Sequence, residues 1–378
     1  MYAIRPSAAW IWGSGGCHGY AQMIALYPEI PGIVNDKVRE EGTAGHWVAH
    51  MMGQGYIVTE GVKAPNAVEV DDDMLDGANL YLTDLRERSA GYPVYMEMTL
   101  LARHIHEQCG GTPDAWSWNP TTRTLTVWDY KYGFRFVDAF ENPQLSIYVS
   151  AVLDYLHQIG AIVLDGHSEQ DITVDIVIVQ PRSFSAGVVR NWKVKAAMLR
   201  PLWNQLRSAA VAVVGANPTL RAGDHCNDCA ARHACPAAQR ASLVALDISA
   251  RSVPHDLTAA QAGDALRRLK AAEQALKSMI TGLEQQVLYS IQQGEQNPHW
   301  SLGYGNTKTV YTEDGEQQIL ALASVMGVDI AKERRAKTPL QVMSIMDPAL
   351  VKRFITTRPG GRKLTPFTER SLRKALSQ

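Results

Sequence analysis

GTPDAWSWNPTTRTLTVWDYK, residues 111–131, predicts two antiparallel strands joined by a tight turn. If the hairpin is symmetric about the peptide between Thr121 and Thr122, Asp114 and Asp129 lie opposite each other, with β-carbons roughly 4.5 to 5.5 Å apart. Lys131 lies two residues beyond Asp129, and residues at i and i+2 share one face of a strand. The hairpin therefore predicts that two carboxylates and one ammonium converge.

Such a cluster fits divalent-metal hydrolysis of phosphodiesters. Carboxylate oxygens hold Mg²⁺ or Mn²⁺, and a neighbouring cation orients the attacking water or offsets developing charge. The simpler alternative is a solvated salt bridge on a surface hairpin. These three residues alone leave both interpretations open.

The segments around the hairpin predict an α/β fold. Residues 35–52 predict a helix and residues 94–100 a strand that contains Glu97. After the hairpin, residues 142–159 predict an amphipathic helix, and the β-branched run at 172–179 predicts a buried parallel strand. The order is helix, three strands, helix, strand. Further helices are expected at 193–215 and 256–293, a β-hairpin at 300–311 and short helices over 315–355.

The predicted first helix contains the sequence Gly42-Thr43-Ala44-Gly45-His46. Its glycines weaken a helix but let another part of the chain approach closely. His46 and His50 are four residues apart and share one helix face. A zinc site built on this pair lacks a third ligand and a general-base Glu, so we do not expect one.

Composition is that of a globular protein: 378 residues, 46% hydrophobic and a formal net charge of -1. The sequence holds no 18-residue apolar run and no signal-peptide hydrophobic region at its start, which predicts a cytoplasmic protein. Residues 331–378 carry twelve Lys or Arg against three acidic residues, a surplus of nine positive charges. A basic segment of this kind suits a polyanionic partner, although a soluble helical appendage would look the same.

The five cysteines are an odd number and a sparse set for a chain of this length, which argues against a secreted disulfide framework. Cys226, Cys229 and Cys235 lie in the segment HCNDCAARHACP, and close thiolates in a reducing compartment favour a metal or cluster. A fourth ligand is needed. Cys17, His225 and His233 are candidates for zinc, whereas ligation by four cysteines would use Cys17 and leave Cys109 out.

Four local patterns stand in a fixed order: Gly-Thr-Ala-Gly-His46, Gly-Thr-Pro-Asp114, Asp129-Tyr-Lys131 and Gln144-x-x-x-Tyr148. Together they resemble the RecB-type branch of the PD-(D/E)XK nucleases over roughly residues 1–240. The cysteine arrangement is similar to the members with a 4Fe-4S cluster, namely the CRISPR-adaptation exonucleases and the helicase-nuclease subunit AddB. The resemblance implies a restriction-endonuclease-like core, a mixed central sheet flanked by helices, with an iron-sulfur region.

The resemblance also implies the roles of particular residues. His46, Asp114, Asp129 and the Tyr130 carbonyl would bind Mg²⁺ or Mn²⁺, and Lys131 would position water or stabilise the phosphate. The remaining implied roles fall to Gln144 and Tyr148 at the site, Glu97 as a supporting carboxylate, and Cys17, Cys226, Cys229 and Cys235 as ligands of the 4Fe-4S cluster.

Two departures limit the resemblance. Residues 250–378 form a mainly helical extension with no counterpart in the minimal CRISPR-type enzymes, and the sequence has no Gly-x-x-x-x-Gly-Lys-Ser/Thr loop. We therefore expect a nuclease domain at 1–240, an accessory region at 250–378, and the activity of a stand-alone DNA exonuclease of phage-recombination or end-processing type. The expected partners are single-stranded or end-resected DNA, a single-strand annealing protein and further copies of the chain, with no membrane.

Two other functions compete with the exonuclease. One is a nucleic-acid-binding scaffold with a degenerate nuclease fold, against which the complete set of His46, Asp114, Asp129 and Lys131 argues. The other is a zinc-finger factor whose metal is held by Cys226, Cys229, Cys235 and His233, and visible absorption near about 400 nm would exclude it because zinc is spectroscopically silent.

Overall fold

A computed structural model of the chain describes residues 4–29, 37–164, 168–183, 187–250 and 257–300, with residues 373, 374 and 376. The chain divides into two compact units, Met1–Tyr289 with Pro366–Gln378, and Ser290–Thr365. The hairpin predicted at 300–311 and the helices predicted over 315–355 lie outside the described residues.

A mixed sheet forms the centre of this unit. In the described part of the chain it has five strands in the order β1 (Val94–Met96), β4 (Ala115–Asn119), β5 (Thr124–Tyr130), β6 (Thr173–Val179) and β7 (Val189–Lys195). Only the β5/β6 pair is parallel; the other neighbours are antiparallel. The predicted hairpin and the predicted parallel strand are both confirmed.

The register of the hairpin is the predicted one. Ala115 pairs with Trp128 and Asn119 with Thr124, so the hairpin is symmetric about the peptide between Thr121 and Thr122. Continued by one residue, this register sets Asp114 against Asp129. Asn119 closes the turn, because its side-chain oxygen accepts hydrogen bonds from the backbone N–H groups of Thr121 and Thr122, both at 3.0 Å.

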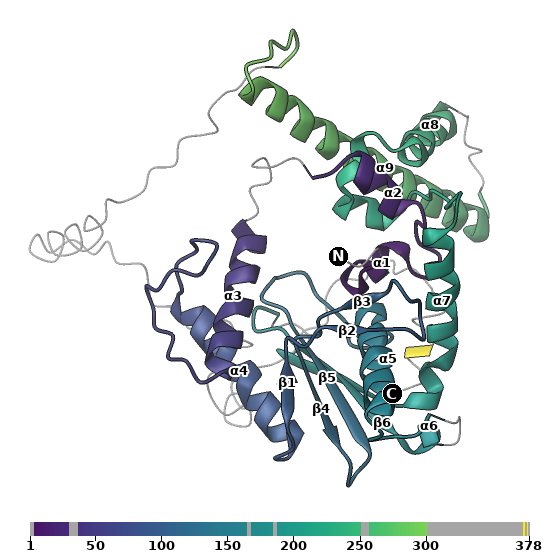
Figure 1. Cartoon of the computed structure of the whole chain (residues 1–378). Coiled ribbons are helices and arrows are strands. Elements are labelled where there is room, and N and C mark those ends of the chain that lie inside the picture. Colours follow the sequence, from purple (N-terminus) through teal and green to yellow (C-terminus); the bar gives the residue numbers. More distant parts are fainter. Residues whose placement is uncertain are drawn as a thin grey trace, which may run out of the picture. The chain divides into compact units, whose positions relative to one another are not determined.

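Helices cover both faces of the sheet (Figure 1). On one face, α3 (Lys37–Gly53) and α4 (Asp72–Ser89) pack on inward side chains such as Trp128 and Tyr130. On the other, α5 (Pro143–Gln158), α7 (Arg200–Val214) and the short α1 (Ala9–Trp12) bury a second core. The crossover from β5 to β6 runs through α5, as a parallel pair requires. The class is therefore α/β, with a mixed sheet flanked by helices.

The ends of two helices follow from their sequences. Asn142 caps α5 by accepting from the Leu145 N–H at 3.1 Å, with Pro143 in the first turn. Asp71 caps α4 in the same way, through the Met74 N–H at 2.8 Å. Asp72 and Asp73 add negative charge to the first turn of α4, where it is favourable.

Two of the expected boundaries are wrong. The strand predicted over 94–100 stops at Met96, because Glu97 adopts a left-handed backbone with φ 51°, and the chain resumes only as the short β2 (Leu100–Leu101). The helix predicted over 193–215 begins at Arg200, since residues 189–195 form β7. Side-chain exposure along β7 alternates with the two-residue period of a strand. The spacing of its apolar residues Val189, Trp192 and Val194 does not follow the 3.6-residue period of a helix.

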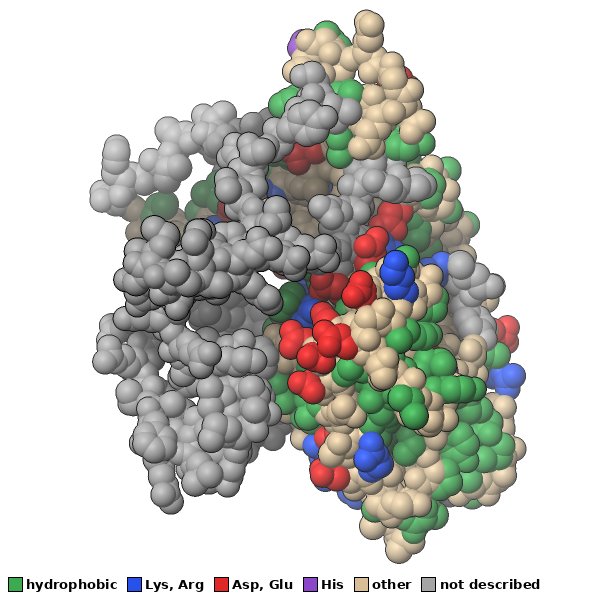
Figure 2. All heavy atoms as spheres, turned by 90° about the vertical axis from the view of Figure 1, so that its left-hand side faces the viewer, with side chains coloured by type: hydrophobic (Ala, Val, Ile, Leu, Met, Phe, Trp, Pro, Cys, Tyr) green, Lys and Arg blue, Asp and Glu red, His purple; other side chains and the backbone are tan. Residues whose placement is uncertain are grey.

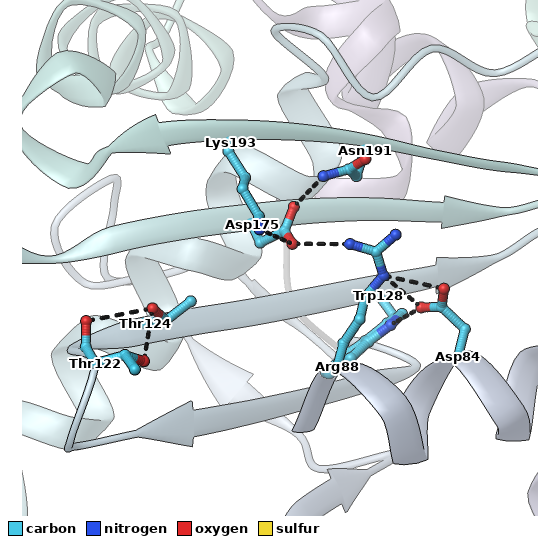
Figure 3. A network of polar contacts seen from close by, with 8 residues as sticks. All are labelled: Asp84, Arg88, Thr122, Thr124, Trp128, Asp175, Asn191 and Lys193. Carbon is cyan, nitrogen blue, oxygen red and sulfur yellow. Dashed lines mark hydrogen bonds and ion pairs between the residues drawn. The ribbon is translucent and has the colours of Figure 1, made fainter. Parts of the chain in front are cut away.

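A polar network ties α4 to the sheet (Figure 3). The Arg88 guanidinium donates to both oxygens of Asp84 at 3.0 Å and to Asp175 at 3.0 Å. The Trp128 indole N–H donates to Asp84 at 2.7 Å, and the Asn191 amide donates to Asp175 at 2.7 Å. Buried carboxylates are tolerable because each receives several donors.

The cysteine-rich segment and the long helix complete the unit. The helix predicted over 256–293 is α9 (Ala259–Gln292), and it packs on the cysteine segment through Ser278–Asn227 and Arg232–Gln285 hydrogen bonds. The first unit runs along this helix to Tyr289, and the domain division expected between residues 240 and 250 stays a prediction. The other elements are η1 (Pro6–Ala8), α2 (Tyr20–Leu26), β3 (Gly110–Gly111), α6 (Ser168–Asp171), η2 (Ala196–Leu199), η3 (Asp224–Asp228), η4 (Ala230–His233) and α8 (Pro236–Ala250).

Charge is distributed unevenly over the surface. The face on the side of α3 and α4 carries a group of acidic side chains (Figure 2). Two cations of the basic C-terminal segment, Arg373 and Lys374, pair with Glu141 at 2.7 Å and with Asp138 at 2.5 Å, just before α5. Among the described residues, no helix is both long and apolar enough to cross a membrane.

Candidate metal centre

The centre is built where the first three strands of the sheet meet. Asp114 immediately precedes β4, and its carboxylate accepts from the Tyr130 N–H at 2.6 Å. Its backbone carbonyl accepts from the Glu97 N–H at 3.2 Å. Asp114 therefore links the end of β1 to the end of β5. Its second carboxylate oxygen, Oδ1, does not take part in these two contacts.

That second oxygen faces His46, which α3 supplies. The His46 Nδ1 lies 3.7 Å from Asp114 Oδ1. The preceding Gly45 lets the helix approach, since a β-carbon there would stand 2.7 Å from the Tyr132 ring. The predicted close approach at this glycine is confirmed, and the edge-on contact of the His46 ring with Tyr130, centroids 5.3 Å apart, orients the imidazole.

Glu97 completes the group from the end of β1. In the described part of the chain, His46, Glu97 and Asp114 form the one set of three or more His, Cys, Asp or Glu residues whose ligand atoms all lie within 4.8 Å of one another. Opposite ligands of an octahedral Mg²⁺ are about 4.2 Å apart. One imidazole and two carboxylates at this spacing are a fitting half-shell for Mg²⁺ or Mn²⁺, with room for water and phosphate oxygens.

Glu97 is held at a cost. Its left-handed backbone is uncommon for a residue with a β-carbon and costs on the order of 1–2 kcal/mol. Burial, together with the charge of Asp114, raises the pKa of Glu97 to about 7. A bound cation would relieve this repulsion.

Asp129 and Lys131 form a second, adjoining group. Lys131 Nζ lies 2.9 Å from Asp129 Oδ1, and the Gln144 amide donates to the same oxygen at 3.3 Å. The other oxygen, Asp129 Oδ2, is buried and has no hydrogen-bond partner in the described structure. A buried carboxylate oxygen without a donor is costly, and a cation or a metal-bound water would satisfy it.

Burial and the neighbouring charges shift the pKa values of both Asp129 and Lys131. Burial raises the pKa of Asp129, partly opposed by Lys131. Burial alone would lower the pKa of Lys131, but the charges of Asp129 and Asp114 outweigh it and the pKa is raised. Lys131 is therefore an ammonium at neutral pH, a hydrogen-bond donor rather than a base.

The remaining predicted site residues lie around these two groups. Tyr148 is buried on α5, one turn beyond Gln144, and burial raises the pKa of its phenol, so it acts as a neutral hydroxyl. Gln144 contacts Asp129 and so orients the carboxylate. Tyr130 contributes its N–H to Asp114 and its ring to His46; metal ligation by its carbonyl stays a prediction.

Four of the five cysteines line one small cavity: Cys17, Cys226, Cys229 and Cys235. The backbone N–H of Arg221 points at the Cys17 sulfur at 3.5 Å, and that of Gly223 at the Cys226 sulfur at 3.4 Å. Burial raises the pKa of Cys229 to about 11 and also raises the pKa of Cys17 and of Cys226, so these three sulfurs would become thiolates only with a compensating cation. Cys109 lies apart, in the core on the α5 side.

The two histidines offered for zinc are placed differently. His225 lines the cavity but hydrogen-bonds the Arg221 carbonyl at 2.8 Å. His233 is not among the lining residues; its ring contacts Tyr27, with centroids 5.7 Å apart. The four-cysteine set is therefore the one that the fold brings together.

The fold and this geometry define a class: an α/β protein with a candidate divalent-metal centre of one histidine and two carboxylates beside a buried Asp–Lys pair. The chain belongs to the DUF2800 family, described as "Protein of unknown function (DUF2800)", which it matches over residues 16–370. No curated protein and no solved structure matches the chain.

Proposed function

We propose that the protein is a Mg²⁺- or Mn²⁺-dependent deoxyribonuclease of the PD-(D/E)XK type that degrades DNA from its ends. The observation that carries the proposal is the juxtaposition of the His46–Glu97–Asp114 group with the Asp129–Lys131 pair. The hairpin register aligns the two aspartates, and the mixed sheet flanked by helices supports the proposal. Glu97 enters as a ligand in its own right.

Each residue has a distinct task. A divalent ion in the centre would supply Lewis acidity to the scissile phosphate and lower the pKa of water. His46, Glu97, Asp114 and the free oxygen of Asp129 would hold it. Lys131, a permanent ammonium, donates to the attacking water or to the phosphate oxygen where negative charge develops. Gln144 donates to the Asp129 carboxylate and holds it in place, and Asp129 in turn positions the Lys131 ammonium.

We propose further that the four-cysteine cavity holds a 4Fe-4S cluster. Cys17, Cys226, Cys229 and Cys235 line one cavity, and ligation by these four cysteines is what the resemblance implies for such a cluster. The cluster would join Cys17 to a segment more than two hundred residues later, a structural role, because closing so long a loop restricts the unfolded chain.

End processing in DNA recombination, as in phages, is the process that such an activity serves, with a single-strand annealing protein as a fitting partner. The test is degradation of end-labelled single- and double-stranded DNA by anaerobically purified protein with Mn²⁺, Mg²⁺ or EDTA. Lys131→Ala is expected to lower the rate at least about 100-fold, and the exposed Lys63→Ala is the matched control. Covalently closed circular DNA should resist.

Two results would contradict the proposal. If the label is lost equally in EDTA, no metal takes part. If Lys131→Ala and Lys63→Ala degrade DNA at the same rate, the Asp129–Lys131 pair has no role in catalysis. An inactive protein with its iron content intact would favour the nucleic-acid-binding alternative.

A further inference from the structure

The loop at residues 133–137, two residues beyond Lys131, exposes two aromatic rings. Phe134 is 62% exposed and Phe136 is 47% exposed, with Arg135 between them. A single exposed ring needs no explanation, but two on one short loop beside a candidate catalytic centre form an apolar feature of the kind that marks a binding site.

The loop is held in this conformation from below. Gln180 is fully buried, and its amide donates to the Gly133 carbonyl at 2.7 Å and to the Arg135 carbonyl at 2.8 Å. Its side-chain oxygen accepts from the Val137 N–H at 3.3 Å and from Arg190 at 2.5 Å. A buried side chain with four hydrogen bonds fixes the loop, so the rings do not turn inward to escape water.

Each exposed ring has a guanidinium against it. Arg182 lies 4.8 Å from the centre of the Phe134 ring, and Arg190 lies 4.8 Å from that of Phe136. Arg135 in turn lies 5.1 Å from the Trp10 ring. Aromatic faces backed by arginines are the elements with which proteins bind unpaired nucleotides.

We propose that residues 133–137 are a stacking platform for the unpaired bases of single-stranded DNA whose backbone passes the metal centre. The proposal rests on the proposed nuclease function and specifies its substrate. Bases within a duplex are already stacked on one another, so their faces are not available to Phe134 and Phe136. Single-stranded ends present these faces, whatever their sequence.

The test measures binding without chemistry. Fluorescence anisotropy of a labelled 15-nucleotide oligo(dT) in EDTA compares wild type with Phe134→Ala/Phe136→Ala. Stacking on aromatic side chains accounts for the expected weakening of at least about tenfold. An abasic oligomer of equal length should bind both proteins equally. Tyr56→Ala, which removes an exposed ring on the connection between α3 and α4, is the matched control and should bind oligo(dT) as wild type does.

Three outcomes overturn the platform: no binding of oligo(dT) by wild type, unchanged affinity in the double variant, or an equal loss with the abasic oligomer. Because both rings are exposed, the variant should keep the thermal midpoint of wild type. The nuclease proposal fails separately, when metal-dependent cleavage is absent or survives Lys131→Ala, and neither result alters the anisotropy measurement.

Discussion

Replacing Arg88 with methionine should loosen the sheet that carries the metal centre. Arg88 is the shared cation of two buried carboxylates, Asp84 and Asp175 (Figure 3). Burial would lower the pKa of Arg88, but the hydrogen bonds and charges of the two aspartates outweigh it and the pKa is raised. Methionine fills most of the space and removes the charge.

The magnitude follows from what remains after the substitution. Removing one partner of a buried ion pair costs about 3–5 kcal/mol, because the other charge is left uncompensated. Asp84 keeps the Trp128 indole and Asp175 keeps Asn191, and Lys193 stands 3.8 Å from Asp175 on the exposed side. Because these contacts remain, we expect a loss of stability at the lower end of that range, about 3 kcal/mol.

The assay is hydrogen exchange of the slowest amides of β5 and β6, which report the free energy of opening the sheet and do not require a two-state transition of the whole chain. A loss of about 3 kcal/mol speeds exchange about 150-fold. The exposed Arg86→Met on the same helix should change the opening free energy by no more than about 0.5 kcal/mol.

If the two variants exchange alike, the network contributes no net stability and the reasoning fails. A second variant separates lost packing from uncompensated charge. Asp175→Asn added to Arg88→Met removes a buried charge that has lost its cation, so exchange should slow again. A further acceleration would show that the charge was not the cause.

Two further predictions concern the two candidate cofactor sites. Because the pKa of Glu97 in the folded protein, about 7, lies above its ordinary value of 4.5, the folded state binds this proton more tightly than the unfolded state. This contribution is fully present below pH 4.5 and is lost as pH rises through 7, so the thermal midpoint of metal-free protein should fall between about pH 5 and 8. Glu97→Gln should flatten the pH dependence of the thermal midpoint. If wild type and Glu97→Gln show the same slope, the Glu97 carboxyl is not its cause. Cys17→Ala should lose bound iron and lower the thermal midpoint, whereas Cys109→Ala, the buried cysteine outside the cavity, should keep its iron; full iron content in Cys17→Ala would disprove the cluster assignment.

Local patterns in the sequence predicted the elements that place the centre. The turn chemistry of Asn119 and the alternation on either side fix the hairpin register, and the register aligns Asp114 with Asp129. The β-branched run predicted β6, because a strand that is buried on both faces consists of almost uninterrupted apolar residues. Such features depend on neighbours in sequence, which is why they could be found without a structure.

Features that depend on tertiary contact were missed or undervalued. Glu97 was expected in the middle of a strand, as a supporting carboxylate. The neighbouring sequence contains no feature that predicts a left-handed backbone conformation at this position. Arg88 and Asp175 lie 87 residues apart, so the network of Figure 3 has no signature in either segment. Phe134 and Phe136 appear in the sequence as ordinary apolar residues; only the buried Gln180 beneath them shows that they are held outward.

Two energetic costs coincide at the end of β1 and the end of β5. Glu97 is held in a left-handed backbone with its pKa raised, and Asp129 keeps one buried oxygen without a donor in the described structure. Strand pairing does not require either cost, because Glu97 lies beyond the last β1 pair and Asp129 pairs with Ile178 of β6 through its backbone alone. A fold tolerates such costs where binding compensates for them, and a divalent cation compensates for both at once: it favours the ionised form of Glu97 and supplies a positive partner for Asp129. The same ion in a protein with Glu97→Gln would satisfy only Asp129, so this substitution should weaken Mn²⁺ binding while leaving the fold intact.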